Sequence, residues 1–335
     1  MQVETLHTRY GPMQVPGGND LISRFLREFG EWAWFEADFV GGFIQKGARV
    51  LDGGAYIGSF TLGLRDCQPL RVVAVEANPA VLGLLQHNLA TLAASWAVVE
   101  HGRLGDGLLP SGMPQPTHAD NLGSMRFAPV TEGTEGTEVT EVTEGTEGTD
   151  GTDGTGVDSN DAPINALSIT LLRQRHGPFD LIKLDVEGSE LAALQADEDW
   201  LRASLPTLWL ECNEDPAVLP LHNFVAGLGY ELHYFTFPSF NPENHLGNPK
   251  PIFALAYEAG LLAVRPGTAV ELPEALAKAG CDLARVKDSA HLLECLWLTP
   301  RWGLEEWVSM SRPQLLALCS RLHRGQSFAG FLGPG

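Results

Sequence analysis

The sequence predicts an α/β fold built on a doubly wound, mostly parallel sheet. Short apolar runs, such as RVLD at residues 49–52 and RVVAVE at residues 71–76, alternate with segments of helical spacing. This alternation is typical of parallel strands joined by helical crossovers. The first run leads into the glycine turn of LDGGAYIGSF, where we expect a helix to open. A strand, a glycine turn and a helix in this order hold nucleotide-like cofactors.

The predicted elements follow one another along the chain. Apolar positions at helical spacing precede the first strand, and the later strands are followed by turns or helices. The pattern stops at an acidic repeat after the third strand and resumes beyond it. We expect helices at residues 20–45, 58–66, 79–90, 189–195 and 217–229, strands at 49–52, 71–76, 96–102, 178–185, 206–211 and 230–237, and a bent strand or hairpin at 253–264.

The chain divides into three predicted parts. Residues 1–45 form an N-terminal helical segment, residues 46–266 the sheet domain, and residues 267–335 a helical C-terminal extension. Within the domain, residues 131–156 read TEGTEGTEVTEVTEGTEGTDGTDGTG and carry eight carboxylates. Because so polar a segment cannot bury apolar surface, we predict a disordered insertion. Closing such a loop costs only about 3 kcal/mol, so a folded domain can carry it.

Charge and composition narrow the classes of function. The chain of 335 residues has a formal net charge of −20 and is 44% hydrophobic. Nucleic-acid partners are disfavoured, because phosphate binding needs a positive surface. The five cysteines have no CxxC or metal spacing, and no run approaches the ~18 apolar residues of a membrane span. Since the start has no apolar signal core, we expect a cytoplasmic protein with reduced thiols; its oligomeric state stays open.

Carboxylates stand at the ends of four predicted strands. They are Asp52, Glu76, Asp185 and Glu211. Parallel strands present their carboxyl ends at one edge of the sheet, where ligands bind. An acid about 20 residues after the glycine turn accepts hydrogen bonds from ribose hydroxyls, although an acid after a strand can also cap the next helix. The glycines lack the G-x-G-x-x-G spacing, which favours a cofactor without pyrophosphate.

Several motifs together resemble the FkbM family of S-adenosylmethionine (SAM)-dependent methyltransferases, within the class I methyltransferases. VLDGGAYIG is similar to the family's D-x-G-A-N-x-G loop, and KLDVEGSE to its K-x-D-x-E-G motif. AVEANPAVLGLLQHNLA resembles its second motif, NLGSM its asparagine–glycine segment, and FNPENHLGNPKPIF a late loop. The resemblance covers about residues 17–265 apart from the repeat. It implies a Rossmann-like class I methyltransferase sheet, mostly parallel with one antiparallel edge strand.

The resemblance implies that the first two strands hold SAM. Asp52 would hydrogen-bond near the methionine amino group, and Glu76 would take the ribose diol. Gly54 would let the backbone approach the cofactor closely, and Gly58 would open the helix. Tyr56 stands where the family loop usually has asparagine, so its contacts with the cofactor should differ.

The acceptor side is expected around KLDVEGSE. Asp185 and Glu187 are candidates for the base that assists a weakly nucleophilic hydroxyl, and their oxygens could also hold Mg²⁺, although no metal motif supports this. Alternatively, Glu187 caps the helix after Gly188 and Asp185 only orders the loop. His233 is a further candidate base, and the resemblance places Asn121 beside the cofactor on the acceptor side.

The sequence thus predicts a SAM-dependent methyltransferase that methylates a hydroxyl of a sugar, a glycan or a related metabolite. That small-molecule or glycan acceptor is its expected partner. An NAD-type oxidoreductase would also have the strand, the glycine turn and the acid that binds the ribose. This chain, however, lacks the G-x-G-x-x-G spacing and any evident tyrosine–lysine or cysteine–histidine pair. The other alternative is a non-catalytic acidic protein that binds a partner through the repeat and the tail.

Overall fold

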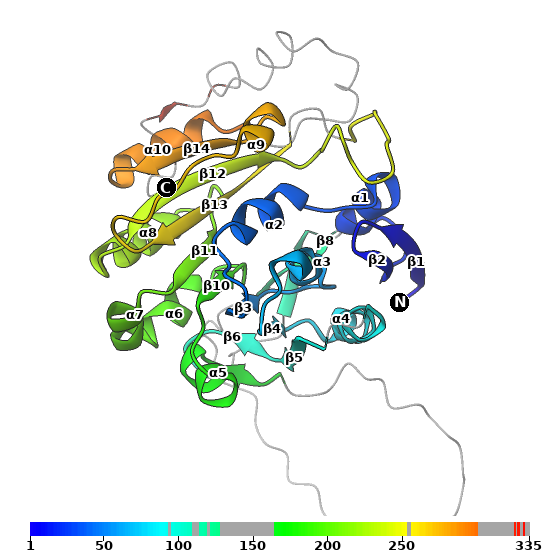
Figure 1. Ribbon diagram of the computed structural model, residues 1–335, viewed down its shortest axis with the longest axis horizontal. Helices are drawn as coiled ribbons and strands as arrows, with labels where there is room; N and C mark the ends of the chain where they lie inside the picture. Colours follow the sequence, from blue (N-terminus) through cyan, green and yellow to red (C-terminus); the bar gives the residue numbers. More distant parts are fainter. Residues whose placement is uncertain are drawn as a thin grey trace, which may run out of the picture.

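The computed structural model describes residues 1–92, 95–108, 114–118, 121–127, 164–252 and 256–300, together with residues 325, 327, 328 and 331. A mixed eight-stranded sheet forms the centre of this part (Figure 1). Its order is β14 (Asp282–Val286), β12 (Glu231–Pro238), β13 (Tyr257–Val264), β11 (Thr207–Glu211), β10 (Leu181–Leu184), β3 (Arg49–Gly53), β4 (Arg71–Glu76) and β5 (Ala97–His101). The strands from β11 to β5 are parallel, which confirms the predicted doubly wound sheet.

Two strands run against the others. β13 lies between β11 and β12, and β14 forms the edge beyond β12. The expected single antiparallel strand at the edge is therefore corrected to two, one of them inside the sheet. The physical reason is the connection: the chain returns from β12 to β13 without a crossover helix, so the two strands pair antiparallel.

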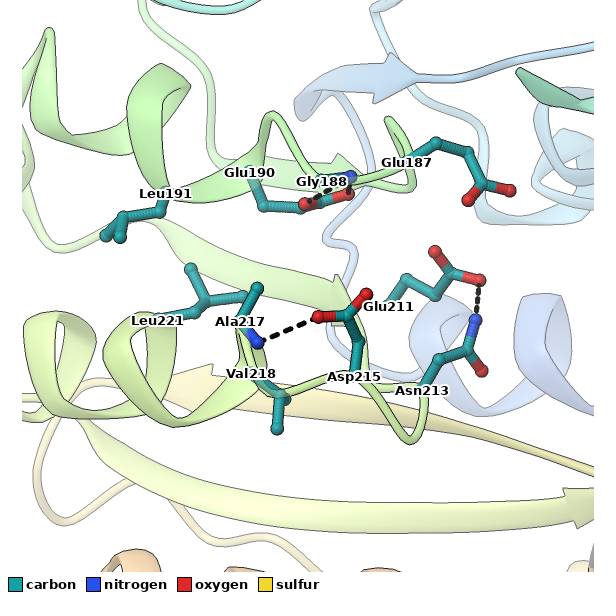
Figure 2. A pocket seen from close by; sticks show the side chains of 10 residues that line it. All are labelled: Glu187, Gly188, Glu190, Leu191, Glu211, Asn213, Asp215, Ala217, Val218 and Leu221. Carbon is teal, nitrogen blue, oxygen red and sulfur yellow. Dashed lines mark hydrogen bonds between the residues drawn. The ribbon is translucent and has the colours of Figure 1, made fainter. Parts of the chain in front are cut away.

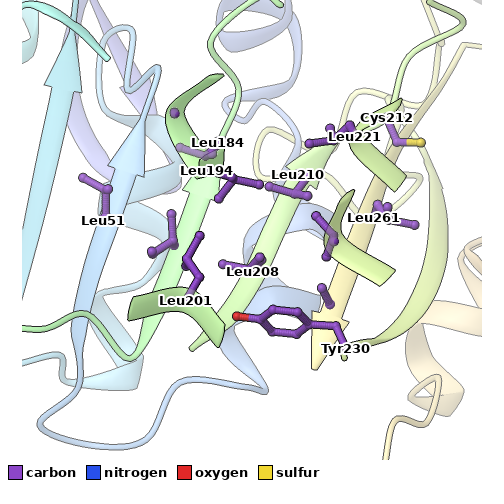
Figure 3. Packing of buried hydrophobic residues seen from close by; sticks show 14 of the residues in the cluster. Leu51, Leu184, Leu194, Leu201, Leu208, Leu210, Cys212, Leu221, Tyr230 and Leu261 are labelled. Atoms are coloured by element: carbon purple, nitrogen blue, oxygen red, sulfur yellow. The ribbon is translucent and has the colours of Figure 1, made fainter. Parts of the chain in front are cut away.

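Helices cover both faces of the sheet, because successive strand residues point to opposite faces. In β10, Ile182 and Leu184 belong to one buried cluster and Leu181 to another. Figure 3 shows the first cluster, where Leu208 and Leu210 of β11 pack beside Leu184. The first face carries α5 (Ile169–His176), α6 (Glu190–Gln195), α7 (Glu198–Ser204), α8 (Val218–Gly227) and α10 (Ser289–Leu298); the second carries α2 (Trp34–Gly41), α3 (Ser59–Gly63) and α9 (Glu274–Lys278).

The N-terminal residues differ from the predicted helical segment. β1 (Val3–Thr8) and β2 (Gly11–Pro16) form an antiparallel hairpin, and helices occupy only α1 (Leu21–Phe29) and α2 within residues 1–45. The hairpin forms because alternate residues of β2, Met13 and Val15, are fully buried. They pack with residues of α1 and of α4 (Pro79–Thr91) in a third cluster. This cluster supports the loop after β3 from one side.

The C-terminal extension is helical only in part. The described part of the extension contains α9, then the strand β14 and then α10, so the run ELPEALAKAGCDLARV, which was predicted to be helical, includes a strand. Gly280, with φ +97°, ends the helical run and lets the chain turn into the strand. Further short elements are the 3₁₀ turn Arg65–Cys67, the parallel pair β6 (Arg103–Leu104) with β9 (Ala166–Leu167), and the hairpin β7 (Pro114–His118) with β8 (Asn121–Phe127). The repeat at residues 131–156 lies outside the described residues.

Candidate functional site

The glycine turn after β3 packs tightly against the chain that follows β10. Gly54 has φ +79°, and a Cβ atom there would lie 1.8 Å from the carbonyl oxygen of Asp185. The amides of Gly54 and Ala55 both donate to the carbonyl of Val75 in β4, at 3.0 and 2.9 Å. Only glycine tolerates this combination of dihedral angle and contact. The turn is thus fixed between the two neighbouring strands, as a cofactor loop requires.

Glu76, at the end of β4, is bonded to the same turn. Its Oε2 accepts the amide of Tyr56 at 2.7 Å, and its Oε1 accepts the amide of Asn78 at 2.7 Å. Burial raises the pKa of Glu76 to about 7, although these amide bonds act in the opposite direction. The carboxylate predicted to take the ribose diol therefore accepts an amide of the glycine turn and orders that turn.

The ring of Tyr56 is turned into the third buried cluster, with residues of α1 and α4. Its backbone has φ +50°, an uncommon value for a residue with a side chain. Burial and the nearby carboxylate of Asp20 raise the pKa of the Tyr56 hydroxyl. At Gly58, φ is +94° and a Cβ atom would lie 3.1 Å from Leu85 of α4, so α3 opens in close contact with α4.

Asp52 and Lys183 form a buried ion pair beneath this loop. Asp52 is fully buried, and its Oδ2 accepts the hydroxyl of Thr61 at 2.5 Å. The Nζ atom of Lys183 lies 3.6 Å from Asp52 Oδ1 and 3.2 Å from Asp185 Oδ2. Burial raises the pKa of Asp52, and the ammonium of Lys183 counteracts that rise. Asp52 thus joins the cofactor loop to the strand end that carries Asp185.

The turn after β10 presents Asp185 and Glu187 at the edge of the sheet. The side chain of Asp185 is 40% exposed. Glu187 has φ +51°, and such strained residues are often found at functional sites. The carboxylate of Glu190, not that of Glu187, accepts the amides of Val186 and Gly188 at 3.0 to 3.2 Å. Glu190, which the motifs did not single out, thus orders the turn, and no side-chain cap bond is found at the start of α6, where the capping alternative placed Glu187.

Two pockets adjoin this turn and share Glu187. The β4–β10 pocket lies beside the glycine turn, and the β10–β11 pocket beside the end of β11 (Figure 2). The former is lined by Gly54, Val75, Glu76, Ala77, Gly102, Arg103, Leu104, Asp185, Val186 and Glu187, and the latter by Glu187, Gly188, Glu190, Leu191, Glu211, Asn213, Asp215, Ala217, Val218 and Leu221. The structure thus brings Gly54, Glu76, Asp185 and Glu187 together, as the motifs predicted.

The β10–β11 pocket is strongly acidic. Figure 2 shows Glu187 and Glu211 entering it from different strand ends, with Asp215 beside Glu211. Burial, and then the carboxylates of Asp185, Glu187 and Glu190, raise the pKa of Glu211 well above its ordinary value. Asn213 donates to Glu211, and Asp215 accepts the amide of Ala217 at 2.8 Å. The sequence marked Glu211 as a strand-end acid, but nothing in it distinguished Asn213 or Asp215.

One further acid, Glu36 in α2, lies near Lys183. Trp209 of β11 donates its indole N–H to Glu36 Oε1 at 2.6 Å. Burial raises the pKa of Glu36 to about 7, while the charge of Lys183 counteracts the rise. In the sequence, Glu36 is an acid within the apolar helical run WFEADFV, and the predicted site residues did not include it.

The structure does not bring His233 to this group. His233 is buried in β12, and both β13 and β11 lie between it and β10. Burial lowers its pKa, with the nearby Arg285 acting in the same direction. Asn121 begins β8, and its side chain lies outside the described residues; the next residue, Leu122, accepts the amide N–H of Asn78 at 3.0 Å. Within the described ranges, no group of three or more acidic, histidine or cysteine side chains is arranged to hold a metal ion.

A family model described as the methyltransferase FkbM domain matches residues 52–232, more than half of the chain. A search of curated proteins found no match. Among the helices that the structure describes, none is both long and apolar enough to cross a bilayer.

The similar solved structures include three methyltransferases. Precorrin-6y C5,15-methyltransferase from Geobacter metallireducens is 13% identical, with a TM-score of 0.37; the match covers 68% of this chain and 87% of that one. A methyltransferase FkbM from Methylobacillus flagellatus is 15% identical, with 64% and 43% covered and a TM-score of 0.35. An O-methyltransferase from Bacillus cereus, in complex with SAH, is 13% identical, with 69% and 79% covered and a TM-score of 0.35.

Proposed function

The chain belongs to the FkbM methyltransferase family, and from this premise we propose that it transfers the methyl group of SAM to a hydroxyl of a sugar, a glycan or a related metabolite. The family membership favours a methyltransferase over the oxidoreductase and the non-catalytic alternatives. The nature of the acceptor atom is the proposed part. The observation that carries it is the pair Asp185 and Glu187, which stand at the turn shared by the two pockets.

The residues around the β4–β10 pocket fit SAM. The backbone at Gly54 leaves no space for a side chain, as expected where a ligand and two strands meet. Of the charged residues that line the pocket, the acids Asp185, Glu187 and Glu76 outnumber the one base, Arg103, and this excess of acids suits the sulfonium and the ammonium of SAM. Glu76 would hold the ribose diol, in exchange for or in addition to its amide bonds. When bound, SAM supplies an activated methyl group.

Asp185 is the residue that we assign as general base. Its carboxylate is 40% exposed and lines the β4–β10 pocket, two residues before Glu187, which lines both pockets. An acceptor hydroxyl that enters between the two residues can reach it. Proton removal by a positioned carboxylate contributes about 10²- to 10⁴-fold to such reactions. Glu187 would orient the acceptor from the β10–β11 pocket. Holding acceptor and methyl group in line supplies most of the remaining acceleration.

The proposal extends to partners and location. The net charge of −20 supports a small-molecule or glycan acceptor rather than a nucleic acid. In the described part of the chain, Cys67, Cys212, Cys281 and Cys295 are not joined by disulfides, and reduced cysteines support the proposed cytoplasmic location.

The experiment that tests this function is incubation with methyl-labelled SAM and extracts of glycans and small metabolites, followed by identification of the product. A labelled methyl ether is the expected result; label on nitrogen, carbon or nucleic acid would overturn the acceptor class. The variant Asp185→Asn should bind SAM within a few-fold of wild type and lose about 10²-fold or more in kcat. The exposed Asp199→Asn serves as the matched control and should keep full activity.

A further inference from the structure

We propose that Lys183 is a positioning residue of methyl transfer, whose buried ammonium fixes the acceptor-side carboxylate Asp185 against the cofactor-side carboxylate Asp52. Glu36 is the third carboxylate of the same cluster. The inference rests on the proposed function, because it assigns Lys183 a task in binding SAM and in orienting the base. The residues Glu36, Asp52, Lys183 and Asp185 are called the Lys183 cluster below.

The position of Lys183 within β10 directs its side chain under the loop. Its neighbours Ile182 and Leu184 face the first buried cluster, so Lys183 points to the opposite face with Leu181. The side chain is 3% exposed, and its Nζ lies 5.2 Å from the centre of the Phe60 ring. A lysine with a buried ammonium needs charged partners, because burial alone disfavours its charge.

Those partners come from separate segments that meet at one point. Lys183 is in register with Asp52 on β3 and with Trp209 on β11, so the three side chains share one face of the sheet. The Nζ atom bridges Asp52, at 3.6 Å, and Asp185, at 3.2 Å. Because Asp52 is also held by Thr61 of α3, it provides a fixed point to which Lys183 ties Asp185.

Glu36 is bonded to the indole of Trp209, and Gly260 leaves the space in which that indole lies. A Cβ atom at Gly260 would lie 2.1 Å from the Trp209 ring, so only glycine lets the indole lie across β13. The indole then donates to Glu36. The charged groups that face Lys183 are therefore Glu36 of α2, Asp52 of β3 and Asp185 after β10. Three carboxylates surround one ammonium, and the excess negative charge suits a cationic cofactor.

A purely structural ion pair would be closed off on all sides. Asp52 is fully buried, but Asp185 at the other end of the pair is 40% exposed and lines the β4–β10 pocket. The contact with Lys183 thus restrains a carboxylate that a ligand can touch. Removing the ammonium should free the Asp185 side chain and weaken both SAM binding and the orientation of the base.

The same cluster gives the inference a pH signature. Lys183 lowers the pKa of Glu36 and of Asp52, whose values burial has raised. Without the ammonium, both carboxyls would bind protons at higher pH and the site would lose negative charge. Because the cofactor is cationic, its affinity would then fall at a higher pH than in wild type. A loss of packing alone would lower the affinity equally at every pH.

The test is a calorimetric titration of SAM between pH 5.5 and 9 with wild type, Lys183→Met, Lys183→Arg and the exposed Lys278→Met as a matched control. Lys183→Met should move the pH of half-maximal affinity upward by about one unit or more. Lys183→Arg, which keeps the charge, should move it less, and Lys278→Met should not move it. Equal shifts in the Met and Arg variants, or an unshifted profile in Lys183→Met, would overturn the inference.

Two further variants cover the case in which Lys183→Met fails to fold. Glu36→Gln keeps an oxygen acceptor for Trp209 and removes one titrating carboxyl, so its SAM affinity should depend less on pH near pH 7; an unchanged profile contradicts the inference.

The double variant of Asp52→Asn with Lys183→Met removes both charges of the buried pair. It should fold, as circular dichroism can verify, yet lose at least tenfold in kcat. Wild-type kcat in this double variant contradicts the positioning role. If wild type itself fails to bind SAM, the proposed function fails, which is a distinguishable result.

Discussion

The two sides of the site are held by different chemical groups. On the cofactor side, Glu76 is bonded to the amides of Tyr56 and Asn78, and the glycine turn donates to β4. On the proposed acceptor side, the acids Glu187 and Glu211 line the same pocket. Burial and the neighbouring carboxylates, that of Glu187 among them, raise the pKa of Glu211. Backbone bonds make the first side rigid before any ligand arrives, whereas the second keeps a repulsion that a ligand or a proton relieves.

The largest expected effect comes from breaking the rigid side at its tightest contact. Gly54→Ala places a Cβ atom 1.8 Å from the Asp185 carbonyl oxygen at φ +79°, so the free energy of unfolding should fall by about 4 kcal/mol. Urea denaturation measures it. Gly229→Ala is the control, because φ is +97° there and no atom lies within 4 Å of the added Cβ; it should cost about 1 kcal/mol. Equal losses in both variants would show that the contact with Asp185 is unimportant.

The pH dependence of stability follows from Glu36 and Glu76, whose pKa burial raises to about 7. Because both folded values exceed the ordinary 4.5, the stability from these groups is complete below pH 4.5 and is lost as the pH rises to 7. The loss should be on the order of 3 kcal/mol for each group. The contribution of Glu36 is measured as the difference in unfolding free energy between wild type and Glu36→Gln at each pH. A difference that does not vary with pH would contradict the assignment.

A smaller effect is expected when the cofactor-side carboxylate is removed. Glu76→Ala leaves the buried amides of Tyr56 and Asn78 without their acceptors, so the unfolding free energy should fall by about 2 kcal/mol. The affinity for SAM should fall at least tenfold, as calorimetry can measure. The surface variant Glu198→Ala loses only an exposed ion pair with Arg202 and should leave both quantities almost unchanged. Undiminished SAM binding by Glu76→Ala would overturn the cofactor assignment.

The acceptor side can be tested at Glu187 without loss of stability. Glu187 adopts φ +51°, which glycine accepts freely, so Glu187→Gly should stabilise the chain by up to about 1 kcal/mol. If Glu187 orients the acceptor, KM for the acceptor should rise while the affinity for SAM stays near wild type. Thermal denaturation and steady-state kinetics separate the two effects. A variant that is both more stable and equally active would exclude Glu187 from the site.

The smallest effect is expected from the acidic repeat. Deleting residues 131–156 shortens a predicted loop, and the change in closure entropy should alter the unfolding free energy by less than about 1 kcal/mol. Methyl transfer should survive, as the assay with labelled SAM can show. Loss of a bound partner with activity intact would instead give the repeat a role of its own.

The geometry of the proposed cofactor side could be anticipated because its residues lie close together in the sequence. The turn from Asp52 to Gly58 and the acid Glu76 belong to two adjacent strand–helix units, so local spacing places them. The Lys183 cluster was not predictable, since Glu36 lies far from Lys183 along the chain and is held near it by Trp209, whose ring needs the space at Gly260. Glu187 and Glu190 lie three residues apart, and spacing alone does not distinguish which of them accepts the amides of the turn, as Glu190 does.

Strands near the ends of the chain were also harder to predict. The hairpin of β1 and β2 includes Pro12 and Pro16, which break a strand pattern, and most of β1 stays at least partly exposed. β14 follows α9 with just a glycine turn between them, so the run ALAKAGCDLARV has apolar positions that fit one helix. In both places tertiary pairing overrides local propensity.

The strand β14 has a consequence for solubility. It covers the outer edge of β12, a strand whose six inner residues are all buried, Tyr234 and Phe235 among them. β14 itself is partly exposed and carries Asp282 and Arg285. Charged, short edge strands discourage pairing with other chains, whereas long apolar ones invite it. A chain cut after residue 266 would present β12 as such an open edge, so the extension protects the sheet from aggregation.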